Sequence, residues 1–148
     1  MTATTDQREV RTIRTFAASR ERVFAAWTDP LQLAQWWGPK GFTNTFHRFE
    51  PRPEGVWDFT MHGPNGMDFR NTCVFRMIIP NERLVFDHLK EMHFYRAEVD
   101  FLDEADGTRI EWIMRFNTAE ELDPIRRLIA AANEQNLDKL EAELLPLN

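Results

Sequence analysis

The side chains with the widest chemical repertoire in this sequence are its four histidines, His47, His62, His88 and His93. None of them stands in an HExxH motif or in another pattern with metal-ligand spacing, so no metal is predicted. His88 and His93 flank the segment Leu89 to Met92. A four-residue hairpin loop there would place the two imidazoles opposite each other on one face of a sheet. They are read either as ordinary polar residues at a strand end or as a proton-transfer or metal site.

Other catalytic signatures are absent from the sequence. It has no serine, histidine and aspartate set, no phosphate-binding loop and no dinucleotide fingerprint, so no cofactor is predicted. Paired acids such as Asp103 with Glu104 and Glu120 with Glu121 stand at predicted turns or helix starts, where they are expected to be solvated or to cap a helix. Whether the protein is an enzyme therefore stays open.

A second group of residues is apolar and follows a period of two. Between Phe42 and Asn117, strand-length segments alternate with turn signals, which predicts an antiparallel meander. In the clearest segment Trp57, Phe59 and Met61 share one face. The same parity predicts one concave surface formed by Trp57, Phe59, Met61, Cys73, Phe75, Met77, Phe86, His88, Tyr95, Ala97, Val99, Phe101, Ile110, Trp112, Met114 and Phe116. This soft lining suits an apolar or aromatic ligand, and a filled core without a cavity is the alternative.

Two short helices are predicted after a first strand at Arg8 to Phe16. Ser19 is a candidate N-cap, and Asp29 followed by Pro30 starts the second helix, which ends before Gly38. Trp36 and Trp37 then stand side by side. Because neighbours on a helix point about 100° apart, we expect one indole to fill the core and the other to lie at a cavity rim. The rim indole is read as a gate or as simple packing.

The sequence pattern of the C-terminal region predicts a long helix, with two alternative residues at which it could begin. Thr118 with Glu121 has capping-box spacing, and Asp123 followed by Pro124 favours a short turn and then a helix from Pro124 to Leu144. Its apolar stripe consists of Ile125, Leu128, Ile129, Ala132, Leu137, Leu140 and Leu144. The small residues Ala130 to Ala132 leave room for a void, with Asn133 and Asn136 as polar contacts beside it.

Composition narrows the class of protein. The chain has 148 residues, 43% of them hydrophobic, and a formal net charge of −6. This length predicts one domain over residues 1–148, and the negative charge argues against nucleic acid and anionic lipid. No apolar stretch is long enough for membrane insertion. The single cysteine, Cys73, lacks a disulfide or CxxC partner, which indicates a reducing, cytoplasmic location.

Several motifs carry a resemblance to a known family. They are FAAWTDP at residues 24–30, WWGP at 36–39, GVWDFTM at 55–61, PNERLVF at 80–86, and Gly107 with Thr108. In this order the chain from Arg11 to Leu144 resembles the bacterial activator of heat-shock-protein-90 ATPase homologue-like family, within the START and polyketide cyclase (SRPBCC) superfamily. The resemblance implies a helix-grip fold. One glycine, Gly55, stands where the family often has two.

Pattern and resemblance together predict an α+β helix-grip fold. A curved antiparallel sheet of about six or seven strands would wrap the C-terminal helix around a hydrophobic cavity. The expected function is to carry or sense a small hydrophobic or aromatic molecule. The ligand-binding residues are predicted to be Trp36, Trp37, Trp57, Phe59, Met61, Phe75, Met77, Phe86, His88, Tyr95, Val99, Trp112, Met114 and Ala132.

Two other functions stay open at this level. One is a cyclase-like or hydrolase-like enzyme that uses His88, Tyr95 or Arg48 in the same cavity. The other, implied by the family resemblance alone, is a chaperone-associated interaction module. A homodimer is compatible with each of them, because the sequence does not specify an oligomeric state.

Overall fold

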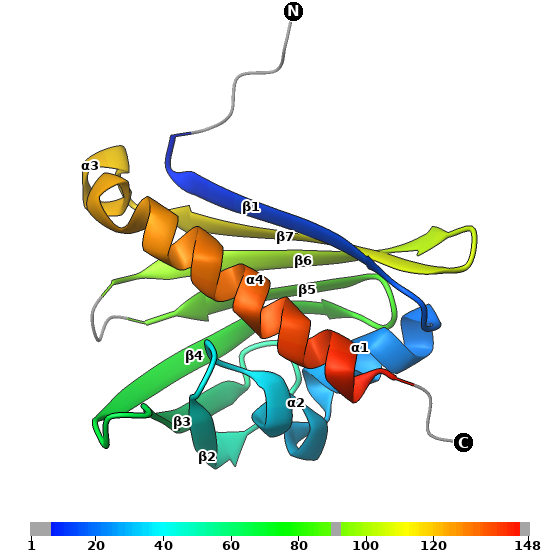
Figure 1. Ribbon diagram of the computed structural model, residues 1–148, viewed down its shortest axis with the longest axis horizontal. Helices are drawn as coiled ribbons and strands as arrows, with labels where there is room; N and C mark the ends of the chain where they lie inside the picture. Colours follow the sequence, from blue (N-terminus) through cyan, green and yellow to red (C-terminus); the bar gives the residue numbers. More distant parts are fainter. Residues whose placement is uncertain (1–6, 90–92, 146–148) are drawn as a thin grey trace, which may run out of the picture.

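The structure is a computed structural model that describes residues 7–89 and 93–145 (Figure 1). Within these residues, seven strands, four α-helices and one 3₁₀ turn follow one another. The strands are β1 (Glu9–Phe16), β2 (Thr43–Phe49), β3 (Val56–His62), β4 (Asp68–Ile79), β5 (Arg83–His88), β6 (Tyr95–Glu104) and β7 (Gly107–Phe116). The α-helices are α1 (Arg20–Thr28), α2 (Pro30–Trp36), α3 (Ala119–Leu122) and α4 (Arg126–Glu143), and a 3₁₀ turn, η1 (Asp123–Ile125), joins the last two.

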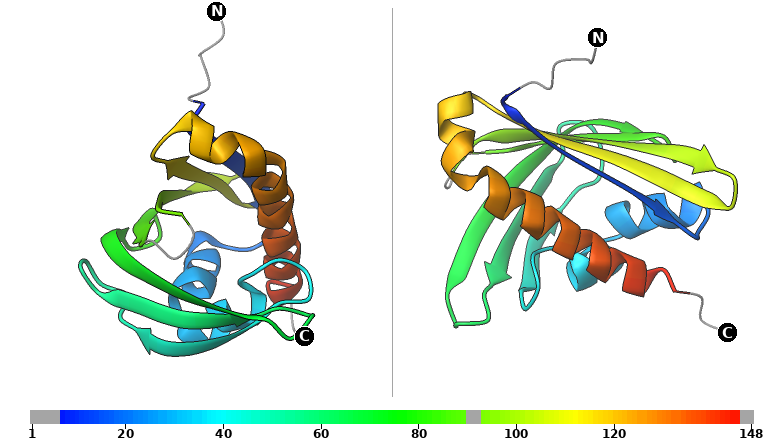
Figure 2. Two further views of the ribbon diagram at one scale, coloured as in Figure 1. Left: turned by 90° about the vertical axis from the view of Figure 1, so that its left-hand side faces the viewer. Right: turned by 45° about the horizontal axis from the view of Figure 1, so that its top comes forward.

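All seven strands belong to one antiparallel sheet in the order β1-β7-β6-β5-β4-β3-β2. The sheet curves, and α4 crosses its concave side (Figures 1 and 2). The first strand forms one edge of the sheet beside the last one. It pairs with β7 in a register that sets Val10 opposite Met114. The predicted α+β helix-grip architecture is confirmed.

The predicted helix starts at Ser19 and Asp29 are confirmed by their hydrogen bonds. The Ser19 hydroxyl accepts from the backbone N–H of Arg22 at 3.2 Å, and the Asp29 carboxylate accepts from that of Leu31 at 3.0 Å. These side chains satisfy amide groups that have no partner within the first helical turn.

The C-terminal helical region begins earlier than the favoured start at Pro124. Thr118 is the residue that caps, because its hydroxyl accepts from the N–H of Glu121 at 3.1 Å. The carboxylate of Asp123 accepts instead from the Arg126 side chain at 3.2 Å. As a result, α3 and η1 form a bent entry to α4, and both Glu121 and Ile125 are carried toward the sheet.

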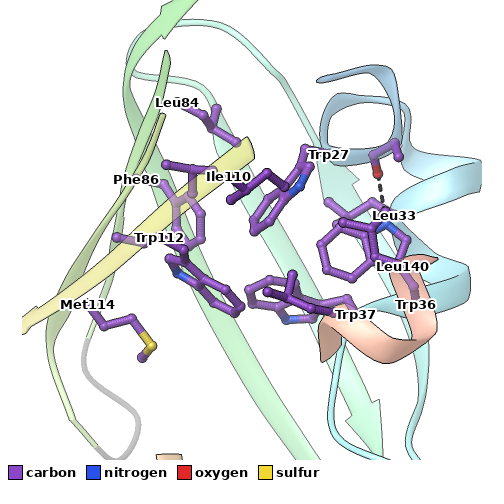
Figure 3. Close-up of a cluster of buried hydrophobic side chains, with 14 of the residues drawn as sticks. Trp27, Leu33, Trp36, Trp37, Leu84, Phe86, Ile110, Trp112, Met114 and Leu140 are labelled. Atoms are coloured by element: carbon purple, nitrogen blue, oxygen red, sulfur yellow. Dashed lines mark hydrogen bonds between the residues drawn. The ribbon is translucent and has the colours of Figure 1, made fainter. Parts of the chain in front are cut away.

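The five tryptophans form one buried cluster, and Figure 3 shows Trp27, Trp36, Trp37 and Trp112 of it. The ring centroids of Trp27 lie 4.7 Å from Trp36 and 5.4 Å from Trp112, and those of Trp37 lie 5.7 Å from Trp112 and 5.2 Å from Trp57. Most of these contacts are edge-to-face, which suits the charge distribution of aromatic rings.

Trp36 and Trp37 are both buried, and their indoles part: Trp36 fills the core, whereas Trp37 also borders a cavity. Trp36 is the last residue of α2, and its Nε1 donates to the carbonyl oxygen of Ala26 at 2.9 Å. Trp37 has already left the helix, with φ −66° and ψ 137°. The angle between helix neighbours therefore does not apply to this pair.

A β-bulge overturns the inward placement of Met77. The pairing of β4 with β5 shifts between Phe75 and Met77, so one extra residue reverses the side-chain alternation beyond that point. Phe75 stays buried, whereas Met77 is 43% exposed on the outer face and Ile78 packs against the core in its place.

Leu128 also departs from the expectation. It belongs to the predicted apolar stripe but is 71% exposed, because α4 packs against β1 and α2 through a narrower face. Leu137 and Leu140 on that face are fully buried, and Asn133 and Asn136 accompany them. At the level of Leu128, its neighbour Ile129 is the residue that packs against the core.

Candidate ligand-binding cavity

Two adjoining cavities lie between the concave face of the sheet and α4. The first has a volume of about 160 Å³ and is bordered by four strands, the α2–β2 connection and α4. Its lining consists of Trp37, Gly38, Pro39, Phe59, Met61, Asn71, Tyr95, Trp112, Met114, Ile129, Ala132, Asn133 and Asn136. Most of these side chains are apolar or aromatic, with three asparagine amides among them.

The second cavity has a volume of about 260 Å³ and lies nearer to α3 and the β5–β6 connection. Its lining consists of Asn71, His88, His93, Tyr95, Met114, Phe116, Ile125, Leu128 and Ile129. Asn71, Tyr95, Met114 and Ile129 border both cavities. Each cavity is smaller than a typical small-molecule site of about 300–1,000 Å³, and together they reach the lower part of that range.

One wall of the first cavity is the segment 38–42, which α4 holds by side-chain hydrogen bonds. The N–H of Gly38 donates to Asn136 Oδ1 at 2.7 Å, and Lys139 Nζ donates to the carbonyl oxygens of Gly38 at 3.2 Å and Phe42 at 3.1 Å. Burial lowers the pKa of Lys139. Gly38 has φ +101°, and a Cβ atom there would lie only 3.0 Å from Met61 Cε. Glycine is favoured here mainly by this positive φ, which other residues rarely adopt.

Asn133 places a polar group in the first cavity, as its position after the alanine run suggested. It is buried, and its Nδ2 donates to Met114 Sδ at 3.3 Å and to Thr12 Oγ1 at 3.5 Å. A thioether is a weak acceptor and the second contact is long, so both bonds are weak. The amide can therefore exchange them for a ligand atom at low cost.

The ring of His88 contacts the backbone of His93 and not its ring, so the expected pair of facing imidazoles is wrong. His88 Nδ1 donates to the carbonyl oxygen of His93 at 2.9 Å, and His88 Nε2 lies 2.7 Å from Asn71 Oδ1. The Asn71 amide nitrogen donates to the Phe69 carbonyl, which turns its oxygen toward His88. The imidazole also stacks on Tyr95 at a centroid distance of 4.8 Å. The loop expected between the histidines falls partly on residues 90–92, outside the described residues.

The ring of His93 is turned toward a carboxylate instead. Its Nδ1 lies 3.7 Å from Glu121 Oε1, and its centroid lies 6.3 Å from that of Phe116. Across the second cavity, burial raises the pKa of the Tyr95 hydroxyl well above its usual range. Tyr95 therefore remains a neutral hydrogen-bond donor at physiological pH.

The predicted binding residues fall into three groups. Those that border a cavity are Trp37, Phe59, Met61, His88, Tyr95, Trp112, Met114 and Ala132. Those that fill the core away from both cavities are Trp36, Trp57, Phe75, Phe86 and Val99. Met77 lies outside. Arg48, considered for the enzyme, is exposed on β2 and pairs with Glu50 at 2.9 Å, away from both cavities.

Sequence reasoning missed several lining residues. Asn71 is the clearest case, because it lies two residues before Cys73 and shares its inward parity, so the alternation could have identified it. Gly38, Pro39 and Ile129 also line the first cavity. The sequence predicts Gly38 and Pro39 as the end of a helix and as part of a family motif, but no local pattern connects them with α4.

The described residues 7–89 and 93–145 contain neither a cluster of metal-type ligands nor a helix suited to span a membrane. Within these ranges, no three histidine, cysteine, aspartate or glutamate side chains converge in a way that could hold a metal ion. None of the helices there combines the length and the apolar character required to cross a bilayer.

A curved antiparallel sheet that grips a C-terminal helix around internal cavities defines a helix-grip domain of the ligand-binding type. The family model described as Activator of Hsp90 ATPase homolog 1-like protein matches residues 17–144. The chain belongs to this family, which confirms the resemblance found in its motifs.

Solved structures agree with this fold. A protein from Arthrobacter aurescens has a TM-score of 0.88 and 26% identity, over 98% of this chain and 92% of that one. A protein from Rhodobacter sphaeroides has a TM-score of 0.86 and 26% identity, over 97% and 95%. A protein from Nitrosomonas europaea, with a TM-score of 0.87 and 20% identity over 95% and 96%, shares the fold. No curated protein matches the chain.

Proposed function

We propose that this protein binds a small apolar or aromatic molecule in the two adjoining cavities and acts as a carrier or sensor. The observation that supports this most directly is that the two cavities adjoin, because Asn71, Tyr95, Met114 and Ile129 border both of them. Their walls combine aromatic rings and flexible methionines with a few convergent amides, which is the usual make-up of a small-molecule site. Residues 1–148 would act as one domain in the cytoplasm.

The structure gives less support to the enzyme alternative, as the positions of Arg48 and His88 indicate. Arg48 lies outside both cavities, and both ring nitrogens of His88 are hydrogen-bonded to oxygen atoms. Neither ring nitrogen therefore presents a free lone pair to a substrate, which a general base requires. A role beside a chaperone rests on the family description alone. Binding is therefore the function that the geometry supports best.

Native mass spectrometry of the protein purified from its own host tests the proposal. We expect a retained small molecule in the wild type and a loss of at least about tenfold in occupancy in Ala132→Phe, because a benzyl group fills the first cavity. Ala142→Phe, at an exposed position on the same helix, is the matched control and should retain the ligand. If the wild type carries no molecule and binds no aromatic probe, the proposal is wrong.

A further inference from the structure

Four side chains from separate elements meet at the second cavity. His88 comes from β5, His93 from the connection before β6, Tyr95 from β6 and Glu121 from α3. The first three border the cavity, and Glu121 lies behind His93, outside the lining. The rest of the wall is apolar except for Asn71. Polar groups of a bound molecule would therefore be recognised at this end of the second cavity, beside His88, His93 and Tyr95.

Glu121 is held in place and lacks a hydrogen-bond partner for one oxygen. Its N–H donates to the Thr118 hydroxyl at 3.1 Å, which fixes the first turn of α3. Its Oε1 atom is buried and makes no hydrogen bond, while His93 Nδ1 lies 3.7 Å away. A buried carboxylate oxygen without a donor is unfavourable, so it favours the tautomer of His93 that carries its proton on Nδ1.

That tautomer determines what His93 offers a ligand. With the proton on Nδ1, the lone pair of the ring lies on Nε2, which accepts a hydrogen bond. His88 is already engaged by the His93 carbonyl and Asn71, and the neutral Tyr95 hydroxyl is a donor. This end of the cavity thus combines an acceptor and a donor with a negative charge directly behind them.

We infer that the ligand is a neutral apolar or aromatic molecule with a hydroxyl group, which donates to His93 Nε2, and that Glu121 selects against carboxylate analogues. A carboxylate offers no proton to His93 and would stand near the charge of Glu121, whose Oε1 atom is buried. Selection thus uses a repulsive element as well as an attractive one. The inference rests on the proposed binding function.

Three matched probes test the inference: 2-naphthol, its methyl ether 2-methoxynaphthalene, and 2-naphthoate. Binding is followed by NMR through the backbone amide signals of Phe116 and Ile129, which border the second cavity. We expect 2-naphthol to bind about fivefold more tightly than the ether, the effect of one net hydrogen bond. We expect 2-naphthoate to bind more weakly than both.

Variants assign the selectivity to the named side chains. His93→Phe keeps a ring but removes the acceptor, so the preference for 2-naphthol over the ether should disappear. Glu121→Gln removes the charge at nearly constant volume, so the affinity for 2-naphthoate should rise by about threefold or more. Glu120→Gln makes the same change at the exposed neighbouring position and should leave all three affinities unchanged.

The outcomes separate this inference from the proposed function. If all three probes bind the wild type equally, or if Glu121→Gln leaves the affinity for 2-naphthoate unchanged, the hydroxyl selectivity is wrong and cavity binding stands. If none of the probes binds the wild type, the proposed function fails and this inference fails with it.

Discussion

Met114 and Met77 are chemically identical residues with opposite surroundings. Met114 lies on β7 and borders both cavities, whereas Met77 is exposed on the outer face of β4. Met114→Ala enlarges the region that the cavities share, so we expect its Kd for naphthalene to change by about threefold or more. Met77→Ala should leave the Kd unchanged. Equal changes, measured by ligand-observed NMR, would show that the inward face of β7 is misassigned.

Helix α4 provides a comparison between two leucines on one element. Leu137 is fully buried and Leu128 is 71% exposed, although a helical stripe contains both. Leu137→Ala should lower the free energy of unfolding by about 2–5 kcal/mol, because it removes buried methyl groups and leaves a cavity. Leu128→Ala should change it by about 0.5 kcal/mol or less. Urea unfolding measures both values, and the reverse ranking would place the other face of α4 against the core.

The turn before β3 contains a residue in an unusual backbone conformation. Glu54 has φ 67°, in the left-handed region that glycine enters at no steric cost. Glu54→Gly should be more stable than Glu54→Ala by about 1 kcal/mol. Both variants lose the ion pair between Glu54 and Arg76, so their difference isolates the backbone term. Equal thermal unfolding midpoints for the two variants would contradict it.

At the scale of the whole molecule, ion pairs tie neighbouring strands together on the outer face. Asp87 is 3% exposed and accepts hydrogen bonds from Arg76 at 2.9 Å and from Arg96 at 2.7 Å. Burial alone raises the pKa of Asp87, but the hydrogen bonds from Arg96 and Arg76 outweigh it and hold the pKa below its ordinary value. These bonds link β4, β5 and β6 behind the cavity.

This pKa shift predicts how stability depends on pH. A carboxyl group whose pKa is lower in the folded state stabilises the protein above its unfolded pKa of about 3.9, and the stabilisation is lost as pH falls through the folded pKa. Asp87→Asn should lower the free energy of unfolding by about 1–3 kcal/mol at pH 7. The difference from the wild type should shrink below about pH 4. Parallel curves of unfolding free energy against pH would contradict the role of Asp87.

The sequence alone determined the features that depend on near neighbours. The caps at Ser19 and Asp29 need only a side chain and the next helical turn, and the alternation around Trp57 needs only the geometry of a strand. The family motifs extended this local reading to the whole fold. Of the eight predicted binding residues that border a cavity, six stand on strands, where side-chain parity is a local property.

Tertiary structure decided the rest, because it depends on contacts between distant segments. The bulge after Phe75 is set by the pairing of β4 with β5, and it moved Met77 to the outside. The way α4 approaches the sheet decides which inward side chains are packed and which border a cavity. Phe86 therefore lies in the packed core, whereas Met114 lies beside a cavity. Glu121 lies behind His93 because the region after β7 bends back over the cavity. The distance between these two side chains cannot be derived from their spacing along the chain.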